Sequence, residues 1–172
     1  LEVQHLVKSY GGRRVVNGLS FKVGSGEIVG ILGPNGAGKT TAINILTGVL
    51  KLDGGSASVC GYNVDKFINE IRRKIGVCPQ FDLLWEDLTA YDHMKLFGEL
   101  KQVQNLEHEI KRSLTEVDLA DNMNGQIKTF SGGMKRRVSL AISLLGCPDL
   151  IIMDEPTTGM DPKVRKLIWN II

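Results

Sequence analysis

Residues 33–41 read Gly33-Pro34-Asn35-Gly36-Ala37-Gly38-Lys39-Thr40-Thr41, and this stretch decides the fold prediction. It fits the P-loop pattern, in which glycines let successive backbone N–H groups approach phosphate oxygens without interference from side chains. We expect Lys39 to reach the β and γ phosphates and the Thr40 hydroxyl to ligate Mg²⁺. The helix that follows adds the positive end of its dipole. A phosphate site is therefore predicted here, the alternative being a glycine turn with a chance Lys-Thr.

The sequence on either side of this loop predicts an α/β architecture. Apolar and polar residues alternate over residues 1–23, which suits short, half-buried strands. The apolar run 27–32 leads straight into the loop and is expected to be the strand that precedes it. A helix is expected over Lys39–Leu46, stopped by Gly48. Further strands are predicted at residues 56–60 and 75–78, with a short helix between them that is capped by Asp65 and carries Ile68, Ile71 and Ile75.

The pattern becomes helical over residues 82–146. Thr89 and Asp92 resemble a capping box. Three apolar stripes at helical spacing are expected to be core faces: Met94, Phe97 and Leu100; Leu106, Ile110, Leu114 and Val117; Met134, Val138, Ile142 and Leu145. A buried strand is predicted over residues 150–153, and Asp161 with Pro162 is expected to start a last helix. The predicted single domain, 1–172, comprises a β subdomain with the P-loop core (1–80), a helical subdomain (81–146) and a return to the core (147–172).

Composition limits the classes of protein to consider. The 21 basic and 19 acidic residues give a net charge of +2, which argues against nucleic acid or an anionic membrane surface as the main partner. Cys60, Cys78 and Cys147 form no C-x-x-C pair, so buried, reduced thiols are predicted rather than disulfides or zinc ligands. No apolar stretch approaches the ~18 residues of a membrane span. Leu1 lies inside an expected strand and Ile172 inside an amphipathic segment, so we expect the sequence to be part of a longer one.

Two acidic residues and a glutamine follow predicted strands. Asp154 is expected to hold the Mg²⁺ shell together with Thr40, and Glu155 to orient and deprotonate the attacking water. A pair of solvated acids at a strand end is the alternative, which the upstream P-loop disfavours. Gln80 follows the strand predicted at 75–78, and its carboxamide oxygen could ligate Mg²⁺ and sense the γ-phosphate. A solvated loop residue is the alternative interpretation of Gln80.

A second glycine segment, Ser131-Gly132-Gly133, begins a predicted helix. Ser131 is a natural N-cap and the glycines expose backbone N–H groups, so the helix start is anion-receptive; an ordinary capped helix is the alternative. One nucleotide cannot easily use both glycine segments of one chain, which suggests two copies meeting over shared nucleotides. The basic run 135–137 is expected to be a solvated face without chemistry. Tyr10, before a Gly-Gly turn, could stack on adenine.

Taken in order, six segments resemble the A-loop, Walker A, Q-loop, signature, Walker B and D-loop of an ATP-binding-cassette (ABC) nucleotide-binding domain: Tyr10, residues 33–41, Gln80, residues 130–134, residues 150–155 and residues 158–161. The resemblance covers essentially the whole chain. It implies a P-loop NTPase fold with a RecA-like core, an N-terminal antiparallel β subdomain and a helical insertion, incomplete at the C-terminus. It also implies ATP and Mg²⁺ as ligands, with Lys39, Gln80 and Glu155 in catalysis and Glu155 as the general base.

The same resemblance implies specific partners. Two such domains dock head to tail, so that Ser131, Gly132 and Gly133 contact ATP held by the Walker A segment of the opposite subunit, with Asp161 along the interface. Four segments are similar in sequence to the A subfamily of ABC transporters, which are mainly lipid transporters: residues 75–82, 88–89, 129–137 and 154–162. Bacterial export ATPases share parts of these sequences. The similarity to the A subfamily implies transmembrane domains as partners, a place on the cytosolic face of a membrane, and ATP hydrolysis coupled to transport. Residues 81–86, apolar and acidic, are the candidate docking surface.

One departure from the family pattern bears on catalysis. The family's switch histidine follows the Walker B strand, whereas His5, His93 and His108 all precede Asp154 and are expected to be ordinary surface or core residues. Efficient hydrolysis by this segment alone is therefore in question, and a nucleotide-binding module without hydrolysis stays an alternative. A soluble ABC ATPase acting on chromosomes or ribosomes is another. Positions 80 and 131 lie too close for the long coiled coil of the chromosome type, and the near-neutral charge gives the ribosome type no support.

Overall fold

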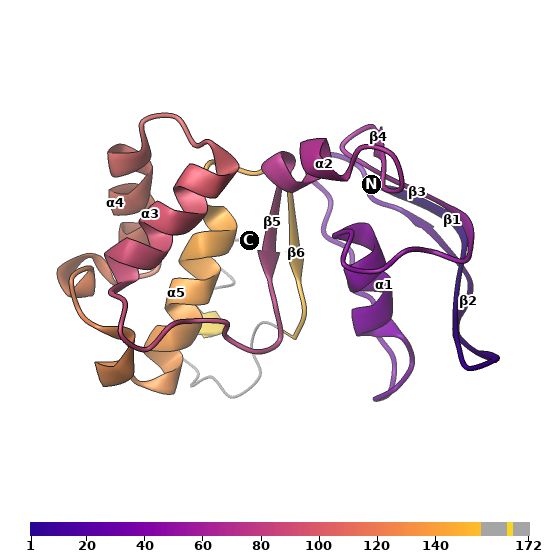
Figure 1. Cartoon of the computed structure of the whole chain (residues 1–172), viewed down its shortest axis with the longest axis horizontal. Coiled ribbons are helices and arrows are strands. Elements are labelled where there is room, and N and C mark those ends of the chain that lie inside the picture. Colours follow the sequence, from indigo (N-terminus) through magenta and orange to yellow (C-terminus); the bar gives the residue numbers. More distant parts are fainter. Residues whose placement is uncertain (156–164, 167–172) are drawn as a thin grey trace. The chain divides into compact units, whose positions relative to one another are not determined.

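The structure, a computed structural model, describes residues 1–155 and 165–166 and divides into two compact units, Leu1–Lys74 and Ile75–Ile172 (Figure 1). The residues expected to start a last helix, Asp161 and Pro162, lie outside the described residues, as does the segment 158–161 compared with a D-loop. Within the described part of the chain, no helix is both long enough and apolar enough to cross a bilayer.

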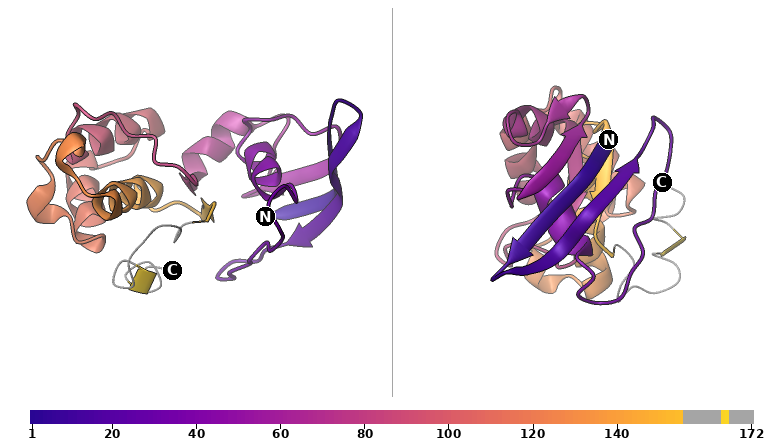
Figure 2. Two further views of the ribbon diagram at one scale, coloured as in Figure 1. Left: turned by 90° about the horizontal axis from the view of Figure 1, so that it is seen from below. Right: turned by 90° about the vertical axis from the view of Figure 1, so that its right-hand side faces the viewer.

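The first unit is built on an antiparallel sheet in the order β2-β1-β3-β4. Its strands are β1 (Glu2–Tyr10), β2 (Arg13–Lys22), β3 (Gly54–Val59) and β4 (Tyr62–Asn63). The indigo strands β1 and β2 form a hairpin that is seen side by side in the right-hand view of Figure 2. Helix α1 (Lys39–Leu46) contacts β2 and β3, and buries Ala42, Ile45 and Leu46. The strands predicted within residues 1–23 and at 56–60, and the helix predicted after the P-loop, are thus confirmed.

Two local predictions for the first unit are wrong. Residues 27–32 form no strand, and Ile28 and Leu32 are 73% and 95% exposed. An apolar run becomes a buried strand only where a neighbouring strand pairs with its backbone, and no described strand of this unit does so. Helix α2 (Ile68–Lys74) starts later than predicted, because the Asp65 N–H donates to Asn63 Oδ1 (3.0 Å) in a turn instead of capping it.

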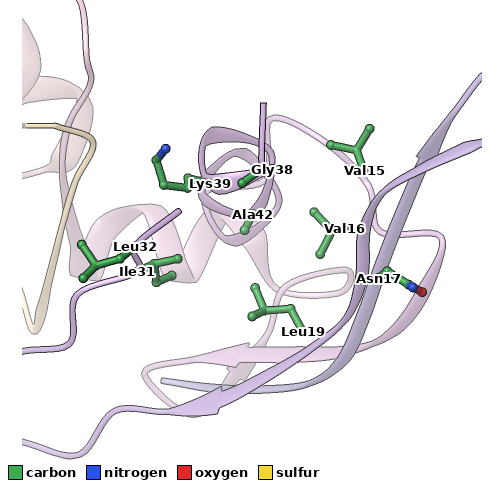
Figure 3. Close-up of a pocket in the computed structure, with 10 residues that line it drawn as sticks. Val15, Val16, Asn17, Leu19, Ile31, Leu32, Gly38, Lys39 and Ala42 are labelled. Atoms are coloured by element: carbon green, nitrogen blue, oxygen red, sulfur yellow. The ribbon is translucent and has the colours of Figure 1, made fainter. Parts of the chain in front are cut away.

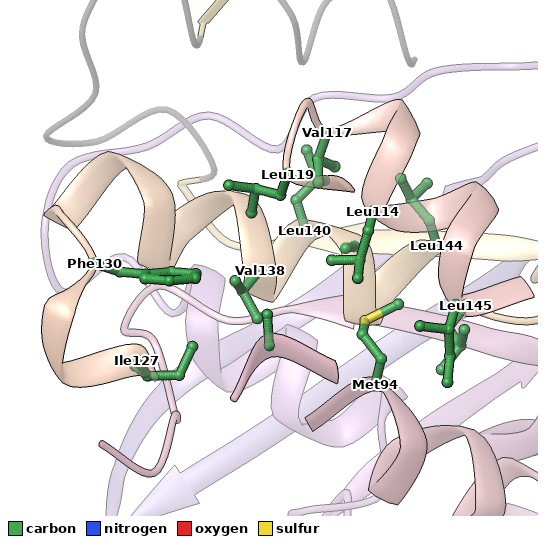
Figure 4. Close-up of a cluster of buried hydrophobic side chains, with 13 residues drawn as sticks. Met94, Leu114, Val117, Leu119, Ile127, Phe130, Val138, Leu140, Leu144 and Leu145 are labelled. Carbon is green, nitrogen blue, oxygen red and sulfur yellow. The ribbon is translucent and has the colours of Figure 1, made fainter. Parts of the chain in front are cut away.

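The second unit holds three helices and a two-stranded sheet among its described residues. The helices are α3 (Ala90–Lys101), α4 (Leu106–Glu116) and α5 (Gly132–Leu144), with short 3-10 turns at Ala120–Asn122 and Ile127–Thr129. The predicted capping box of α3 is confirmed, since the Thr89 side chain accepts from the Asp92 N–H and the Asp92 side chain accepts from the Thr89 N–H. The three helices enclose an apolar core shown in Figure 4, whose labelled residues are Met94, Leu114, Val117, Leu119, Ile127, Phe130, Val138, Leu140, Leu144 and Leu145.

Most of the predicted stripes face this core, but Leu100 does not. It follows Met94 by six positions, which at about 100° per residue places it about 240° around the helix from Met94. Leu100 is accordingly exposed, whereas Met94 is buried. The prediction of buried thiols holds for Cys78, whereas Cys60 is half-buried and Cys147 exposed; the described residues contain no disulfide.

The sheet of the second unit pairs β5 (Ile75–Cys78) with β6 (Leu150–Met153) in parallel. Both strands were predicted, and Ile152 is the buried residue of β6. Helix α5 packs on β5 so closely that a Cβ at Gly76 would lie 1.8 Å from the Ser143 carbonyl oxygen. Because Cys78 pairs with Met153 in a parallel ladder, both strands end at the same edge of the sheet, and the residues that follow them lie at that edge. That edge positions three of the predicted site residues.

Candidate functional site

The P-loop is shaped by glycines at two positions with positive φ. Gly36 and Gly38 have φ of 81° and 92°, and the Ala37 N–H donates to the Pro34 carbonyl (3.1 Å), which closes the turn that contains Gly36. A Cβ at Gly38 would approach the Val15 carbonyl oxygen of β2 to 2.6 Å. Gly38 is therefore required both by its conformation and by a close approach of backbone to backbone. The loop itself, residues 33–37, is exposed.

Lys39 is the first residue of α1, and its ammonium group lies over the loop. Its Nζ donates to the carbonyls of Gly33 (2.8 Å) and Pro34 (3.2 Å). In the described structure no side chain caps the start of α1, and no acidic residue lies in its first turn. The orphan N–H groups of a helix start, the dipole and a lysine together favour an anion. These residues fit the phosphates of a nucleotide, with Thr40 exposed beside Lys39 and Thr41 next along the helix.

A cavity of about 240 Å³ lies beside this loop, within the first unit (Figure 3). Side chains of β2, mostly apolar, form one wall, and the other is formed by Ile31 and Leu32 before the P-loop together with the end of the P-loop and α1. The labelled lining residues are Val15, Val16, Asn17, Leu19, Ile31, Leu32, Gly38, Lys39 and Ala42. A cavity with apolar walls next to a positively charged anion-binding site suits a ligand that has an apolar part and a phosphate part. Tyr10 ends β1 with its ring exposed and Lys8 Nζ 5.8 Å from the ring centroid, and it does not line this cavity.

In the second unit, the structure brings Gln80 and Glu155 together, 75 positions apart in sequence. Gln80 Nε2 donates to Glu155 Oε2 at 3.0 Å. The contact follows from the parallel register, since each residue lies two positions beyond the last pair, Cys78 and Met153. The bond uses the amide nitrogen of Gln80, whereas the carbonyl oxygen is the atom of an amide that coordinates a metal. The two predicted residues thus share one edge of the sheet.

Asp154 and Glu155 adopt different environments at this edge. Asp154 is buried, and its N–H donates to the Cys78 carbonyl (3.0 Å), which continues the ladder by one bond. Glu155 is half-buried and has φ of 45°, in the left-handed region that a non-glycine residue seldom adopts. Such conformations persist where the surroundings hold them in place.

Arg136 is the residue that sequence reasoning missed. The basic run 135–137 was predicted to be solvated, but the Arg136 side chain is only 6% exposed. Its guanidinium donates to the Pro79 carbonyl, to Asp82 Oδ1 (3.2 Å) and, more distantly, to the carbonyls of Gln80, Asp154 and Glu155 (3.4 Å each). The sequence signal was the spacing of Arg136, Leu140 and Leu144, which share one helix face. Lys135 and Arg137 are half-buried.

The second glycine segment forms the start of α5, as predicted. Ser131 is the N-cap, and its Oγ accepts from the Met134 N–H at 3.2 Å. Ser131 and Gly132 are exposed, and a Cβ at Gly132 would meet no described atom within 4 Å. A glycine in open space at a helix start leaves its backbone accessible to a ligand. Gly133 follows within the first turn of α5.

The segment 81–86, between β5 and α3, exposes apolar side chains on a well-anchored backbone. Phe81 is 75% exposed, and Leu83 and Trp85 are also exposed. The Trp85 N–H donates to Nε2 of the buried His93 (2.9 Å), and the two rings stack with centroids 5.6 Å apart. Because Nε2 accepts, His93 Nδ1 carries the proton and donates to the Thr89 carbonyl (2.8 Å). His93 is thus a core residue, as predicted, and it holds Trp85 in place.

The residues predicted to hold Mg²⁺ are a hydroxyl, an amide and a carboxylate. Thr40 belongs to the first unit, and Gln80 and Asp154 belong to the second. Among residues 1–155 and 165–166, no three His, Cys, Asp or Glu side chains form a cluster that could hold a metal. Oxygen donors of this kind suit Mg²⁺, which proteins bind through few side chains together with phosphate oxygens and waters.

Comparisons with known proteins agree with this arrangement of segments. A family model described as ABC transporter matches residues 16–158. ABC transporter A family member 12 of Arabidopsis thaliana is 46% identical over 178 residues, which cover 98% of this chain and 19% of that protein. Member 5 of the same family and organism is 47% identical, over 93% of this chain and 18% of that protein. The chain thus spans about a fifth of the length of these relatives.

A solved structure has the same fold. It is described as the ATP binding subunit of an ABC transporter and superposes with a TM-score of 0.90 at 30% sequence identity, covering 98% of this chain and 71% of that one. The match supports the predicted P-loop NTPase fold with an N-terminal antiparallel sheet and a helical part. The matched residues 16–158 include the P-loop, Gln80, the start of α5 and the pair Asp154 and Glu155.

Proposed function

This chain belongs to the ABC transporter family, as an ATP-binding domain similar to those of A-family members, and from that premise we propose that it hydrolyses ATP to drive transport. The observation that carries hydrolysis is the contact between Gln80 and Glu155 at the carboxyl edge of β5 and β6. It places a carboxylate and an amide together where α/β nucleotide sites collect their catalytic groups.

The residues of the P-loop bind and orient the phosphates. Backbone N–H groups of the P-loop, other than Pro34, which has none, and of the start of α1 donate to the phosphate oxygens. The Lys39 ammonium gives up its bonds to the Gly33 and Pro34 carbonyls and binds the β and γ phosphates instead. Bound Mg²⁺ supplies neutralisation of phosphate charge, and Thr40, Gln80 and Asp154 are the residues that would hold it. Tyr10, exposed at the end of β1, is proposed to stack on adenine.

Glu155 is the proposed general base. Its half-buried carboxylate takes the proton of the attacking water, and the Gln80 amide orients that carboxylate by donating to it. Asp154 is the next residue in the chain, is buried and would hold Mg²⁺, so the two acids are proposed to have separate roles that follow from their different environments. Phosphoryl transfer needs little covalent chemistry from the protein, so positioning and charge carry the rate.

We also propose a second copy of such a domain as partner, docked head to tail. The exposed Ser131 and Gly132 at the start of α5, with Gly133, would contact the nucleotide held by the P-loop of the other copy. A nucleotide bound to the P-loop of one copy does not need the anion-receptive start of α5 in that same copy. Docking of a second copy gives this helix start a role. The transport step is proposed to act on lipid at the cytosolic face of a membrane, which rests on the similarity to A-family members.

Transmembrane domains are the proposed partner of the segment 81–86. Its exposed Phe81, Leu83 and Trp85, rimmed by Asp82 and Glu86, form an apolar surface of the kind that marks protein contacts. His93 holds the backbone of this surface, so movement of the second unit would carry the surface with it. The surface follows Gln80 directly along the chain, which places the nucleotide-sensing residue and the docking segment next to each other.

The test of hydrolysis is Glu155→Gln in the full-length polypeptide. We expect kcat for ATP hydrolysis to fall by about 100-fold or more with ATP affinity retained, because the amide keeps the shape but cannot accept the proton. An ATP-bound dimer should then accumulate, as measured by size-exclusion chromatography or light scattering. Glu99→Gln, at an exposed position on α3, is the control and should stay within about twofold. Wild-type hydrolysis by Glu155→Gln would contradict the assignment.

The test of docking is Leu83→Asp in the same polypeptide, with phospholipid translocation in proteoliposomes as the measurement. We expect loss of ATP-driven translocation while ATP still binds, because a charge on the apolar surface opposes its burial against a partner. Leu100→Asp, a similarly exposed leucine on α3, is the matched control. Normal translocation by Leu83→Asp would count against this surface.

A further inference from the structure

Arg136 contacts the backbone on both sides of the proposed catalytic pair. One guanidinium nitrogen, Nη1, donates to the Pro79 carbonyl and lies 3.4 Å from the Gln80 carbonyl oxygen. The other, Nη2, lies 3.4 Å from the carbonyl oxygens of both Asp154 and Glu155. Only an arginine has donors arranged in a planar fork that can serve two such segments at once.

These contacts fall where the sheet no longer determines the backbone. The last paired residues are Cys78 and Met153, and one further bond joins the Asp154 N–H to the Cys78 carbonyl. Beyond that bond, Gln80 and Glu155 have left the ladder, and Glu155 has φ of 45°. The guanidinium supplies backbone contacts to both residues at the positions where the ladder has stopped.

The charge of Arg136 is held in place by its burial. Its side chain is 6% exposed, and Asp82 Oδ1 lies 3.2 Å from Nη1 with its own side chain 23% exposed. A buried cation must keep its partners, because an unpaired buried charge is strongly unfavourable. The guanidinium, its carboxylate and its carbonyls therefore form a unit with one favourable arrangement.

We propose that Arg136 is a positioning residue for ATP hydrolysis, which sets the separation and orientation of Gln80 and Glu155 by binding the backbone of both. This inference rests on the proposed function, since it needs Glu155 as the base. Arg136 acts through these two residues, whose side chains meet at 3.0 Å. A misplacement of catalytic groups by about 1 Å can lower a rate by about 100-fold, so loss of the guanidinium should act on the rate.

The test compares Arg136→Met and Arg136→Lys with wild type in the full-length polypeptide. We expect kcat for ATP hydrolysis to fall by about tenfold to 100-fold in both, with KM for ATP changed by less than about threefold, because the P-loop residues that bind nucleotide are untouched. Arg136→Lys keeps the charge but should not rescue the rate, because one ammonium cannot reach both segments. Activity is expressed per ATP-binding site, so that a variant that folds poorly is still measured on its folded fraction.

The matched control is Arg137→Met, one position along α5. The Arg137 side chain donates to the carbonyls of Val117 (3.2 Å) and Asp118 (2.8 Å) and to no residue of the catalytic pair. The Arg137→Met substitution should lower the melting temperature, while kcat per ATP-binding site stays within about twofold of wild type. Equal loss of kcat in the Arg136 and Arg137 variants would show a general structural effect and overturn the proposal.

A double-mutant cycle with Glu155→Gln separates the proposal from its premise. If Arg136 acts through Glu155, Arg136→Met should lower the residual rate of Glu155→Gln by less than about threefold. The same tenfold or larger loss in both backgrounds would overturn the positioning role, as would a wild-type kcat in Arg136→Met. Wild-type hydrolysis by Glu155→Gln alone would instead reject the general base, and so the proposed function.

Discussion

The P-loop and the edge of the β5–β6 sheet are both proposed to act on one nucleotide, yet they are built in opposite ways. The P-loop is a run of consecutive residues, exposed, with Lys39 folded over the carbonyls of its own loop. The sheet edge is assembled from three segments that are far apart in the sequence, around a buried guanidinium. One region presents backbone N–H groups, whereas the other presents side chains on an ordered backbone.

The difference shows how each region keeps its geometry. A loop of glycines needs the right φ angles and one close approach, at Gly38, so its shape depends mainly on local conformation. The sheet edge needs strand register, the packing of α5 on β5 and the contacts of Arg136, all of which are tertiary. The geometry of the sheet edge should therefore respond to substitutions far from the proposed catalytic residues, whereas the geometry of the P-loop should not.

The largest effect is expected from Gly76→Ala, which attacks the packing beneath the sheet edge. Its Cβ would lie 1.8 Å from the Ser143 carbonyl oxygen, so α5 and β5 must separate. We expect the free energy of unfolding to fall by about 4 kcal/mol or more, measured by chemical denaturation. Gly30→Ala, whose Cβ would meet no described atom within 4 Å, should stay within about 0.5 kcal/mol. A small effect at Gly76 would remove the contrast between the two regions.

A smaller effect, about 3 kcal/mol, is expected for Gly38→Ala in the P-loop. It combines the cost of a positive φ with a 2.6 Å approach to the Val15 carbonyl oxygen. Gly36→Ala is the matched variant, because its φ is also positive but its Cβ would have open space; it should cost about 1–2 kcal/mol. Thermal and chemical denaturation measure both. Equal costs for the two variants would show that conformation alone, without the contact to β2, shapes the loop.

The pKa of the Cys78 thiol tests how far water is excluded from β5. Burial raises the pKa of this thiol to about 11, with Arg136 lowering it and Asp82 raising it as smaller effects. The thiol has a higher pKa in the folded protein than in the unfolded chain, so the protonated thiol favours the folded state. This contribution to stability is complete below the unfolded pKa of about 8.5 and is lost as the pH rises toward 11. We expect the wild-type chain to lose about 2 kcal/mol more stability between pH 8.5 and 11 than Cys78→Ala. Equal losses in the two proteins would mean that this strand is accessible to water.

The smallest effect is expected from Thr89→Ala, which removes a local signal from the second unit. The hydroxyl accepts from the Asp92 N–H at 3.0 Å, and its loss should cost about 1 kcal/mol by denaturation. Thr115→Ala serves as the control, because its hydroxyl donates to the Lys111 carbonyl within an exposed turn of α4. It should stay within about 0.5 kcal/mol. A loss at Thr89 as large as that at Gly76 would show that local capping, and not packing, dominates the second unit.

Most predictions from the sequence that rested on a local signal succeeded, the helix cap expected at Asp65 being an exception. The capping box at Thr89, the helix that follows the P-loop and the N-cap at Ser131 depend on residues within one turn, and the structure confirms each. Predictions failed where the pairing of strands or the packing of a helix determines the structure. The apolar run 27–32 was predicted to be a strand from composition, but a strand also needs a partner for its backbone.

The same distinction applies to the candidate site. Gln80 and Glu155 were selected singly, each from its place after a predicted strand, and their contact follows from the parallel register of β5 and β6. Arg136 was assigned to solvent because a basic run is usually hydrated. The spacing of Arg136 with Leu140 and Leu144 places it on a buried face of α5, but its burial depends on the contact of that face with the sheet, which is tertiary.

The sequence by itself determined the loop that is proposed to bind phosphate, the family and the order of the segments, because glycines, a lysine and a hydroxyl at short spacing suit that chemistry wherever the chain places them. Tertiary structure alone decided which side chains surround Glu155. The contacts of Glu155 join residues up to 75 positions apart, and such contacts form only when strand register and helix packing bring distant segments together. Arg136 illustrates the reason, since the same basic side chain is a solvated charge on an open helix and a buried guanidinium against this sheet.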